Sequence, residues 1–514
     1  MAAKWLRRIA IFLVFSLLIS FGAWAVPRAL DPTDRTAEKR AQDKRWVESS
    51  PYFWDRQACR WVGLCGLHHL RRDPPSGANS GYYWDDNDKI RGELRKRANW
   101  EEGGPQLDPK RNIHDRRRVL EDVPEYVTRY APLVHLYSGE EFWPSDIKEH
   151  VEHMTVFVDD EPLNTSDHKW TLHNLHKLNP LGDLIMLRSN DDVESRPSWL
   201  HSHQNIPNPF KEKPGEAIKK PSHPHGGGLP IERERTTWYD VDKNHPMHRI
   251  SDPRHRGSDT QHAKRLTTRG HKPDADGYSK APAVLIVVDK GSGIVDAFWF
   301  FFYSYNLGQT VLGLRFGNHV GDWEHCMVRF ENGVPRGVFF SEHEGGQAYA
   351  WEAVEKSANG RPVIYSAIGS HAMYPLPGPH PYIIPFGLLK DVTDKGPLWD
   401  PSLNKYAYHY DYVVDKGHAD DSEKGPSERE SRDSGSLVPA AENPSAPTSW
   451  FHFAGRWGDE VYSLADPRQW RLFGQYHYVT GPDGPKFKAL NRSKLCQLES
   501  CHISYELDPL GKWY

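Results

Sequence analysis

The stretch that most constrains the fold runs from residue 283 to residue 306. It reads AVLIVVD over 283–289, continues through the turn residues KGSG, and then reads IVDAFWFFFYSYN over 294–306. A strand that is apolar on both faces of its pleat has to be covered on both sides, so these two runs predict strands at the centre of a buried sheet. The KGSG sequence between them is typical of a hairpin turn. The rest of the chain has to supply the layers that cover this sheet.

Further strands are predicted downstream of this pair. The runs EHCMVRF (324–330) and VPRGVFFSEH (334–343) are joined by the turn ENG and predict a second hairpin, and RPVIYSAIG (361–369) predicts another strand. A last β-like unit begins with TSWFHFAGRWGDEVY (448–462). The 19 Trp, 23 Tyr and 20 Phe favour sheets over a helix bundle. We therefore predict a mainly β protein whose core is an antiparallel β-sandwich with long polar insertions.

Composition divides the chain further. Two stretches, 203–278 and 417–448, contain few apolar residues and no period, so we expect them to be disordered insertions. The expected order is a signal peptide or anchor (1–26), an accessory or stalk region (27–120), a first part of the β-rich core (121–202), the insertion 203–278, a central β-sandwich with the GNHVGDWEH loop (279–416), the loop 417–448, and a C-terminal β segment that completes the core (449–514).

The N-terminus predicts entry into the secretory pathway. Lys4, Arg7 and Arg8 precede an apolar run over 9–26, and the AWA sequence at 23–25 offers a signal-peptidase site. The run is about 18 residues long, which is also near the lower limit for an uncleaved membrane anchor. In either case residues 27–514 are expected on the luminal side of the secretory pathway, free or anchored facing the lumen, with secretion as the alternative.

Five cysteines are compatible with an oxidising lumen. Cys59 and Cys65 form one close pair in the sequence, and Cys496 and Cys501 form another. Each pair can close a short disulfide loop, and the two pairs can equally be cross-linked to each other. Cys326, the odd one, is expected to be a small buried hydrophobic residue.

Net charge and glycosylation sequons restrict the partners and the compartment. The chain has 65 Lys and Arg against 69 Asp and Glu, a formal net charge of −4, which offers no basic surface for nucleic acid. Sequons at Asn164 and Asn491 are typical of a glycoprotein that enters the secretory pathway.

The sequence GNHVGDWEH, residues 317–325, concentrates groups that bind metals or protons. Asp322 and Glu324 are two positions apart at a strand entrance, so their carboxylates can point the same way, and His319 precedes them on a glycine-flanked turn. Two carboxylates and an imidazole predict a site for a hard divalent cation, Mg²⁺, Ca²⁺ or Mn²⁺, with room for water. The alternative is a polar turn in which the carboxylates bond only the loop backbone.

Other polar residues at strand ends are candidate ligand-binding residues. Ser341 and His343 end the second strand of the hairpin and His371 ends the next strand, so they surround the same site if these ends share an edge. Trp323 either contributes to this site or packs on the opposite face, and His371 is alternatively a satisfied core histidine. A catalytic triad of Ser341, His343 and Asp322 is disfavoured because residues two apart rarely align as nucleophile and base.

Several long strings resemble one family. The sequences YAPLVHLYSGEEFWPSDI, NDDVESRPSWL and RFGNHVGDWEHCMVRF are similar to the fungal vacuolar protein sorting-associated protein 62 family. The resemblance spans roughly residues 125–415 and resumes at 449–514. It implies a part in the delivery of proteins to the vacuole and an N-terminal signal or anchor, but it implies no molecular mechanism.

A more distant resemblance concerns the site. The necrosis- and ethylene-inducing-like proteins carry the heptapeptide GHRHDWE, which coincides here at His319, Asp322, Trp323 and Glu324. In that family the polar positions hold a divalent cation on a single-domain β-sandwich that recognises sphingolipid head groups. Asn306, at the end of the aromatic strand, is the counterpart of a metal-binding aspartate. Gly321 replaces the second histidine and Asn318 replaces the leading glycine, which argues against lytic activity.

These observations support three interpretations, of which we favour the first. In it, a non-enzymatic, luminal protein of the vacuolar sorting pathway holds a divalent cation with His319, Asp322, Glu324 and Asn306, and the cation binds a membrane lipid head group, a glycan or a phosphate. In the second, the same cation activates water in a hydrolase, with His343 or His371 as proton carrier. In the third, the protein is a purely structural trafficking component.

Overall fold

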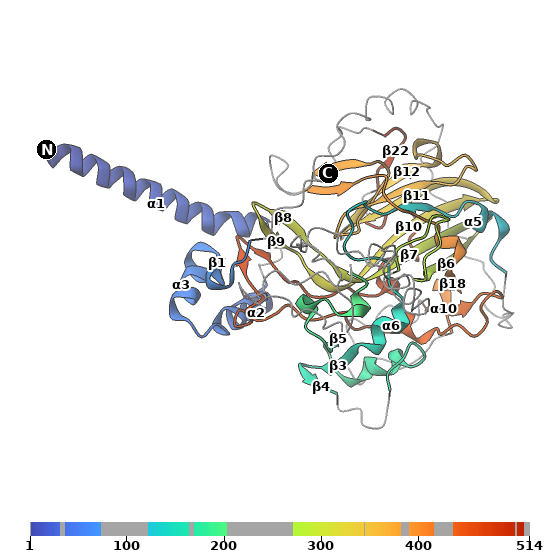
Figure 1. Ribbon diagram of the computed structural model, residues 1–514, viewed down its shortest axis with the longest axis horizontal. Coiled ribbons are helices and arrows are strands. Elements are labelled where there is room, and N and C mark those ends of the chain that lie inside the picture. Colours follow the sequence, from blue (N-terminus) through green and yellow to red (C-terminus); the bar gives the residue numbers. More distant parts are fainter. Residues whose placement is uncertain are drawn as a thin grey trace, which may run out of the picture. The chain divides into compact units, whose positions relative to one another are not determined.

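The computed structural model describes residues 2–30, 36–72, 122–163, 169–202, 271–343, 345–381, 390–415, 435–498 and 501–507 (Figure 1). The chain divides into two compact units. The smaller unit comprises residues 1–73, 308–319 and 459–481, and the larger comprises residues 74–307, 320–458 and 482–514.

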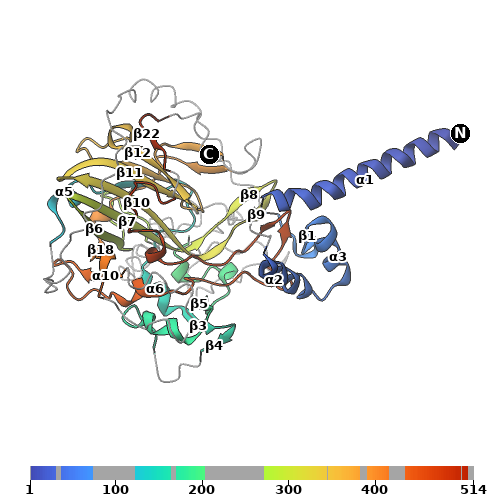
Figure 2. The same cartoon turned by 180° about the vertical axis from the view of Figure 1, so that it is seen from behind.

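The centre of the larger unit is a sheet of eight strands, side by side in both views (Figures 1 and 2). In spatial order they are β19 (Leu437–Pro439), β18 (Lys405–Tyr410), β6 (Ala283–Gly291), β7 (Ile294–Asn306), β10 (His319–Glu331), β11 (Val334–Glu342), β12 (Gly345–Ala350) and β22 (Ile503–Ser504). The strands predicted at 283–289, 294–306, 324–330 and 334–343 are therefore confirmed as β6, β7, β10 and β11.

The aromatic strand β7 is buried on both faces, as its sequence predicts. Its odd-numbered side chains, from Ala297 to Tyr303, belong to one hydrophobic cluster, and its even-numbered side chains, from Phe298 to Phe302, belong to another. This division follows from the alternation of side chains along a strand. Each of these side chains is at most 2% exposed, so the sheet is covered on both sides.

Two layers cover the central sheet. One face packs against a four-stranded sheet in the order β14 (Met373–Tyr374), β13 (Val363–Ser366), β2 (Leu133–His135) and β17 (Leu398–Trp399). The other face packs against α6 (Ile147–Glu152) and a small sheet of β4 (Glu161–Pro162), β3 (Met154–Val158) and β5 (Ile185–Ser189), with Trp450, Phe451, Phe453 and Trp457 from the C-terminal part. Figure 1 shows α6 and β3–β5 on one side of the central strands.

Both predicted hairpin turns are present. Ser292 and Gly293 connect β6 to β7, and Asn332 and Gly333 connect β10 to β11. All four residues have positive φ, between 50° and 79°, which is the backbone that two-residue hairpin loops require. In the first turn a Cβ on Gly293 would also lie 2.1 Å from Oδ1 of Asn332, so the Asn332 side chain would have to move to accept one.

The sandwich is mixed rather than antiparallel, which corrects part of the predicted fold class. β18 pairs with β6, β12 with β22, and β13 with β2, each in the parallel direction. Each of these pairs joins strands that are far apart in the chain, and parallel neighbours require such crossover connections. Local hairpin signals in the sequence could not reveal these pairings.

Two predicted segment boundaries also change. The β-like unit predicted to begin at 448–462 begins instead with the 3₁₀ helix η14 (Ser449–His452), whose Trp450 and Phe451 pack into the core. Within the predicted loop 417–448, residues 437–439 form the edge strand β19, whereas 416–434 lie outside the described residues. Residues 203–270 of the predicted insertion 203–278 also lie outside them.

The smaller unit contains most of the described N-terminal residues. Its helices are α1 (Ala2–Leu30), α2 (Ala37–Glu48) and α3 (Phe53–Val62), and its strands are β1 (Leu64–Cys65), β20 (Arg471–Leu472), β21 (Gln475–Tyr476), β8 (Gln309–Val311) and β9 (Leu314–Phe316). The predicted stalk is thus mainly helical where it is described, with the short strand β1 as the exception, and its residues 31–35 and 73–120 are not described. Within the described part of the chain, no helix meets the length and apolarity needed to cross a membrane.

The cysteines pair locally. Disulfides join Cys59 to Cys65 and Cys496 to Cys501, so the alternative in which the two pairs are cross-linked is wrong. Cys326 is free and fully buried in the core between the two sheets, and burial raises the pKa of its thiol well above the usual value. It is a packing residue, as predicted.

Candidate functional site

Strand β10 separates the polar residues of GNHVGDWEH onto two faces. Trp323 and Met327 belong to the cluster on one face, while Cys326 belongs to the cluster between the two sheets. By strand alternation Asp322 and Glu324 share the face of Cys326. Both carboxylates are 4% exposed, so the strand places two acidic groups in a buried environment.

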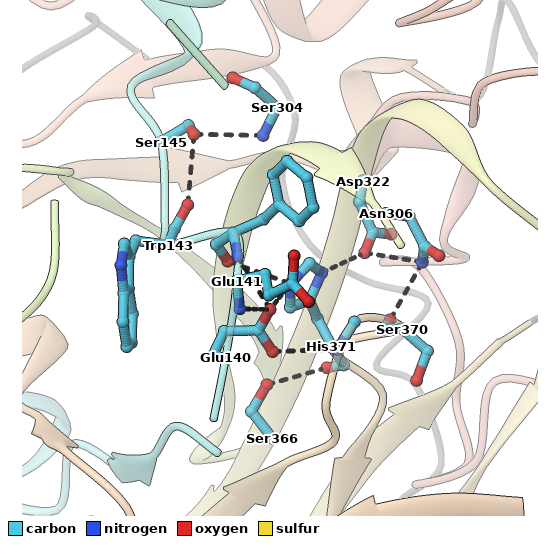
Figure 3. Close-up of polar contacts among 12 residues, drawn as sticks. Glu140, Glu141, Trp143, Ser145, Ser304, Asn306, Asp322, Ser366, Ser370 and His371 are labelled. Carbon is cyan, nitrogen blue, oxygen red and sulfur yellow. Dashed lines mark hydrogen bonds and ion pairs between the residues drawn. The ribbon is translucent and has the colours of Figure 1, made fainter. Parts of the chain in front are cut away.

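Asp322 is held by a buried histidine and an amide. Nδ1 of His371 lies 2.9 Å from Oδ2 of Asp322, and Nδ2 of Asn306 donates to the same oxygen at 3.1 Å. On its other side Nε2 of His371 lies 3.6 Å from Oε1 of Glu140, so the imidazole lies between two carboxylates (Figure 3). The ring also stacks on Tyr303, with 3.7 Å between centroids and 2° between planes.

His371 is charged in this environment. Burial lowers the pKa of His371, but the carboxylates of Glu140 and Asp322 outweigh burial and raise it to about 9. The imidazolium therefore neutralises part of the charge of its two acidic neighbours at neutral pH. His371 was predicted either to bind a ligand or to be a core histidine whose ring nitrogens are hydrogen-bonded within the protein. These contacts match the second role.

The hydrogen bonds continue from Asn306 to the surface. Nδ2 of Asn306 also donates to the carbonyl oxygen of Ser370 at 3.1 Å, and Oγ of Ser370 donates to Asp391 at 2.7 Å. Asp391, in β16 (Lys390–Thr393), also accepts from Tyr374 at 2.8 Å and contacts Nε2 of His343 at 2.8 Å. The side chain of His343 is 38% exposed, so it is the outer end of the chain of contacts.

These contacts also set the protonation of the outer pair. Burial tends to raise the pKa of Asp391, but His343, Ser370 and Tyr374 lower it below its usual value. Burial lowers the pKa of His343, but Asp391, Glu324 and Glu342 raise it to about 9. A cation therefore stands at the outer end of the site at neutral pH.

Glu324 is hydrogen-bonded by a hydroxyl group, and the charges of Lys488 and His343 favour its ionised form. Its Oε2 accepts a hydrogen bond from Oγ of Ser341, which also accepts from the backbone N–H of His325 at 2.8 Å. The pairing of β10 with β11 ends at Cys326 and Phe340. Directly beyond that point, the Ser341 hydroxyl accepts the hydrogen bond from the backbone N–H of His325. Burial and the charge of Asp322 raise the pKa of Glu324 to about 8. Among the described residues Glu324 makes no ion pair.

The structure thus brings together most of the predicted site residues. We call the following set the polar cluster: Glu140, Asn306, Asp322, Glu324, Ser341, His343, Ser370, His371 and Asp391. All of its members lie in the larger unit. His319, the first residue of β10, belongs to the smaller unit and is half-buried.

Trp323 and His325 do not belong to the polar cluster. Trp323 is 1% exposed and stacks at 12° on Trp450, with Trp457 at its edge, so it is a packing residue and not a contact for a ligand. His325 is fully buried against Phe300, and within the described part of the chain neither of its ring nitrogens has a hydrogen-bonding partner. Burial lowers the pKa of His325 far below its usual value.

The donor set of the polar cluster suits a hard cation only in part. Carboxylate and amide oxygens from Asp322, Glu324 and Asn306 are the ligand type that Mg²⁺, Ca²⁺ and Mn²⁺ prefer. However, the described residues of the cluster do not place three acidic or imidazole ligand atoms within 4.8 Å of one another. The predicted ligand set with His319 is therefore not shown by the structure.

Three members of the polar cluster were not predicted from the sequence. Glu140 lies in GEEFWP, Ser370 directly precedes His371, and Asp391 follows an undescribed segment. Ser370 could have been noticed because it is adjacent to a candidate residue. Glu140 and Asp391 reach the site only through the fold, and no spacing in the sequence connects them to Asp322.

Gly321 is fixed by packing. Its φ is +71°, and a Cβ at this position would lie 2.0 Å from the carbonyl oxygen of Trp457. A histidine at this position, as in the heptapeptide GHRHDWE, would therefore collide with the backbone. The departure from that pattern noted in the sequence has a steric cause.

Comparison with solved structures gives distant neighbours. The crystal structure of necrosis and ethylene inducing protein 2 from the causal agent of cocoa's witches' broom disease is 20% identical over 19% of this chain and 46% of that chain, with a TM-score of 0.16. The crystal structure of the non-toxic HaNLP3 protein is 16% identical over 24% of this chain and 51% of that chain, also with a TM-score of 0.16.

Comparison by sequence gives relatives that cover most of the chain. The family model described as vacuolar protein sorting-associated protein 62 matches residues 290–384. The putative vacuolar protein sorting-associated protein TDA6 of Saccharomyces cerevisiae is 37% identical over 76% of this chain and 71% of its own length. Vacuolar protein sorting-associated protein 62 of the same yeast is 34% identical over 76% of this chain and 72% of its own length. The chain therefore belongs to the vacuolar protein sorting-associated protein 62 family.

Proposed function

We propose that the protein acts in vacuolar protein sorting as a luminal, non-enzymatic binding protein, and that Asp322 and Glu324 hold a hard divalent cation. The names of both yeast relatives support the sorting role. The observation that carries the cation is Glu324, a buried carboxylate beside Asp322 that has a hydroxyl for a partner and no described ion pair. A bound divalent cation would replace the proton that Glu324, with its raised pKa, carries at neutral pH, and both carboxylates would hold the ion.

A cation at this position would bind an anionic ligand. Divalent cations keep coordination positions for water or phosphate oxygens when the protein supplies few ligands. His343 adds a second attraction, because its imidazole is partly exposed and protonated at neutral pH. A lipid head group, a glycan or a free phosphate each offers the oxygens that such a site takes.

Binding is a better match to the polar cluster than hydrolysis. A general base works best when its pKa lies near the operating pH and it is free to accept a proton. The neighbouring carboxylates raise the pKa of His343 and of His371 to about 9, so both rings already carry the proton. His371 is in addition fully buried with both nitrogens engaged.

The first prediction concerns cation-dependent stability. Adding Ca²⁺, Mg²⁺ or Mn²⁺ to the chelator-treated full chain is expected to raise its melting temperature. A ligand present at 100 times its Kd stabilises the folded state by about 2.7 kcal/mol. In Glu324→Gln this rise should be lost, because the amide keeps the shape of the side chain but removes the charge that binds the ion.

The matched control is Glu331→Gln, which removes a partly exposed carboxylate elsewhere in the larger unit, outside both groups of candidate metal ligands. It should respond to these cations like the wild type. If the wild type gains no stability from any of the three cations, or if Glu324→Gln gains as much as the wild type, Asp322 and Glu324 do not form the site.

The second prediction concerns location. We infer that α1 is the targeting segment, since its apolar side chains from Ile11 to Phe15 are all exposed. The sequon residue Asn491 is also exposed, as a glycan acceptor must be. In yeast cells the protein is expected to carry a glycan that Asn491→Gln removes, seen as a higher gel mobility. Deleting residues 2–26 should abolish glycosylation at every sequon.

The second sequon, at Asn164, lies outside the described residues. The double variant Asn164→Gln/Asn491→Gln therefore serves as the fully unglycosylated standard. Wild-type protein that migrates with this standard and is cleaved by protease added to intact microsomes would contradict a luminal location.

A further inference from the structure

A second group of ligand-type side chains lies outside the polar cluster. Glu149 is in α6, His201 follows the 3₁₀ helix η7 (Ser198–Leu200), and His271 opens the chain after the undescribed residues 203–270. One ligand atom from each of the three lies within 4.8 Å of the other two. Nothing in the local sequence around any of them indicates a metal motif.

The distances suit an ion of the size of zinc. Nε2 of His201 lies 2.8 Å from Oε2 of Glu149, and Nε2 of His271 lies 4.0 Å from the same oxygen. In a tetrahedral zinc site with bonds of about 2.0–2.2 Å, ligand atoms are about 3.3 Å apart. The two observed distances lie on either side of this separation, so an ion could enter with sub-ångström shifts of the side chains.

The arrangement of the rings also suits metal binding. The imidazoles of His201 and His271 stack with 3.7 Å between centroids and 23° between planes. Two protonated rings would repel each other at this separation, whereas two neutral rings each offer a lone pair. Nδ1 of His271 contacts the carbonyl oxygen of Pro144 at 3.1 Å, which fixes the proton on Nδ1 and leaves Nε2 to bind a metal.

His201 is held in a costly position. It is 5% exposed, has a φ of +53°, and its Nδ1 has no hydrogen-bonding partner among the described residues. A left-handed backbone at a residue other than glycine raises the free energy of the folded state, and such residues cluster at functional sites. An unpartnered, buried ring nitrogen adds to this cost.

We propose that Glu149, His201 and His271 form a binding site for Zn²⁺ or a similar divalent transition metal. Two imidazoles and one carboxylate are the donor set that favours such ions over Mg²⁺ or Ca²⁺. The side chain of Glu149 is 37% exposed, which leaves a fourth coordination position open to water. This site is separate from Asp322 and Glu324 in both its residues and its metal preference.

The site joins two chain positions that flank residues 203–270. His201 and His271 are brought together although the whole of this segment separates them in sequence. Bringing together two residues that are far apart in the sequence costs conformational entropy, and an ion bound to both would offset that cost in the folded protein. We infer that the metal fixes both flanks of the segment to α6 through Glu149.

The test is zinc binding by the full chain, measured by competition with a chromophoric chelator. One equivalent of Zn²⁺ is expected to bind the wild type. His271→Ala and Glu149→Gln should weaken that binding by about 100-fold or more, since even changes to residues behind metal ligands cost about 10–100-fold. The melting temperature should rise with Zn²⁺ in the wild type and not in either variant.

Two controls separate this site from other zinc ligands. His223→Ala/His225→Ala removes a pair of histidines outside the described residues, and Glu324→Gln alters the polar cluster. Both should bind one equivalent of Zn²⁺ like the wild type. Circular dichroism of the metal-free variants checks that they fold, and Glu149→Gln, which keeps its shape, decides the matter if His271→Ala does not fold. No zinc bound to the wild type, or equal affinity in Glu149→Gln, would overturn the proposal.

Discussion

Replacing His371 with asparagine is expected to lower the free energy of unfolding by about 3–5 kcal/mol, the range found when one partner of a buried charge pair is removed. The substitution leaves Asp322 and Glu140 buried without the cation that lies between them. It also removes the ring that stacks on Tyr303. The measurement is chemical denaturation of wild type and variant at pH 7.

Asparagine is used at position 371 so that the loss of the positive charge is measured with little added backbone strain. His371 has a φ of +56°, a conformation that asparagine tolerates better than alanine, so His371→Ala should be the less stable of the two variants. The double variant His371→Asn/Asp322→Asn should lose less than the sum of the single losses, because it removes one of the unpaired charges. Strictly additive losses would show that the ion pair contributes nothing.

The pH dependence of the His371 effect has a defined sign. The folded-state pKa of about 9 lies above the usual value of 6.5, so the folded protein holds this proton more tightly than the unfolded chain. The stabilisation is fully present below pH 6.5 and is lost as the pH rises through 9. The stability difference between wild type and His371→Asn should therefore become smaller between these values.

Acid is expected to destabilise the protein through other buried histidines. Burial lowers the pKa of His150 to about 3 and that of His380 to about 4, although backbone carbonyls accept from both rings. The unfolded chain takes up these protons from pH 6.5 downward while the folded protein does not. Each of the two histidines should therefore cost about 1.4 kcal/mol of unfolding free energy per pH unit below 6.5.

A variant that cannot be protonated at position 150 separates the effect of His150 from that of His380. Nε2 of His150 contacts the carbonyl oxygen of Trp457 at 3.0 Å, and the ring lies edge-on to Trp199 and Phe302. His150→Gln keeps an N–H donor but cannot be protonated. Unfolding free energies of wild type and variant, measured from pH 7 to pH 5, should converge by about 2 kcal/mol. Parallel pH profiles would show that His150 has the same pKa in the folded protein as in the unfolded chain.

The parts of the fold that the sequence predicts are those decided locally. The apolar run of β7 shows no alternation, so this strand has to be buried on both faces. Asn332 and Gly333 both adopt the positive φ of a two-residue hairpin turn, a conformation that few other residue pairs favour. The shared face of Asp322 and Glu324 follows in the same way from the period of a strand. The burial of Trp323 on the opposite face follows from that same period.

The parts that it does not predict depend on long-range packing. The parallel pairing of β18 with β6 joins two strands that are far apart in the sequence. Glu140 and Asp391 approach Asp322 and His343 from remote segments, and the convergence of Glu149, His201 and His271 has the same origin. The alternation of apolar residues and the turn sequences concern residues that are close in the chain. They therefore do not predict contacts between remote segments.

The most direct test of the proposed function is the cation content of the purified full chain. The protein and its Glu324→Gln variant are equilibrated with Ca²⁺, Mg²⁺ or Mn²⁺ in turn, dialysed, and analysed for metal by elemental analysis. The proposed function predicts one equivalent of one of these ions in the wild type and its loss in the variant. Wild-type protein free of all three, or a variant that retains the same equivalent, would contradict a cation site at Asp322 and Glu324.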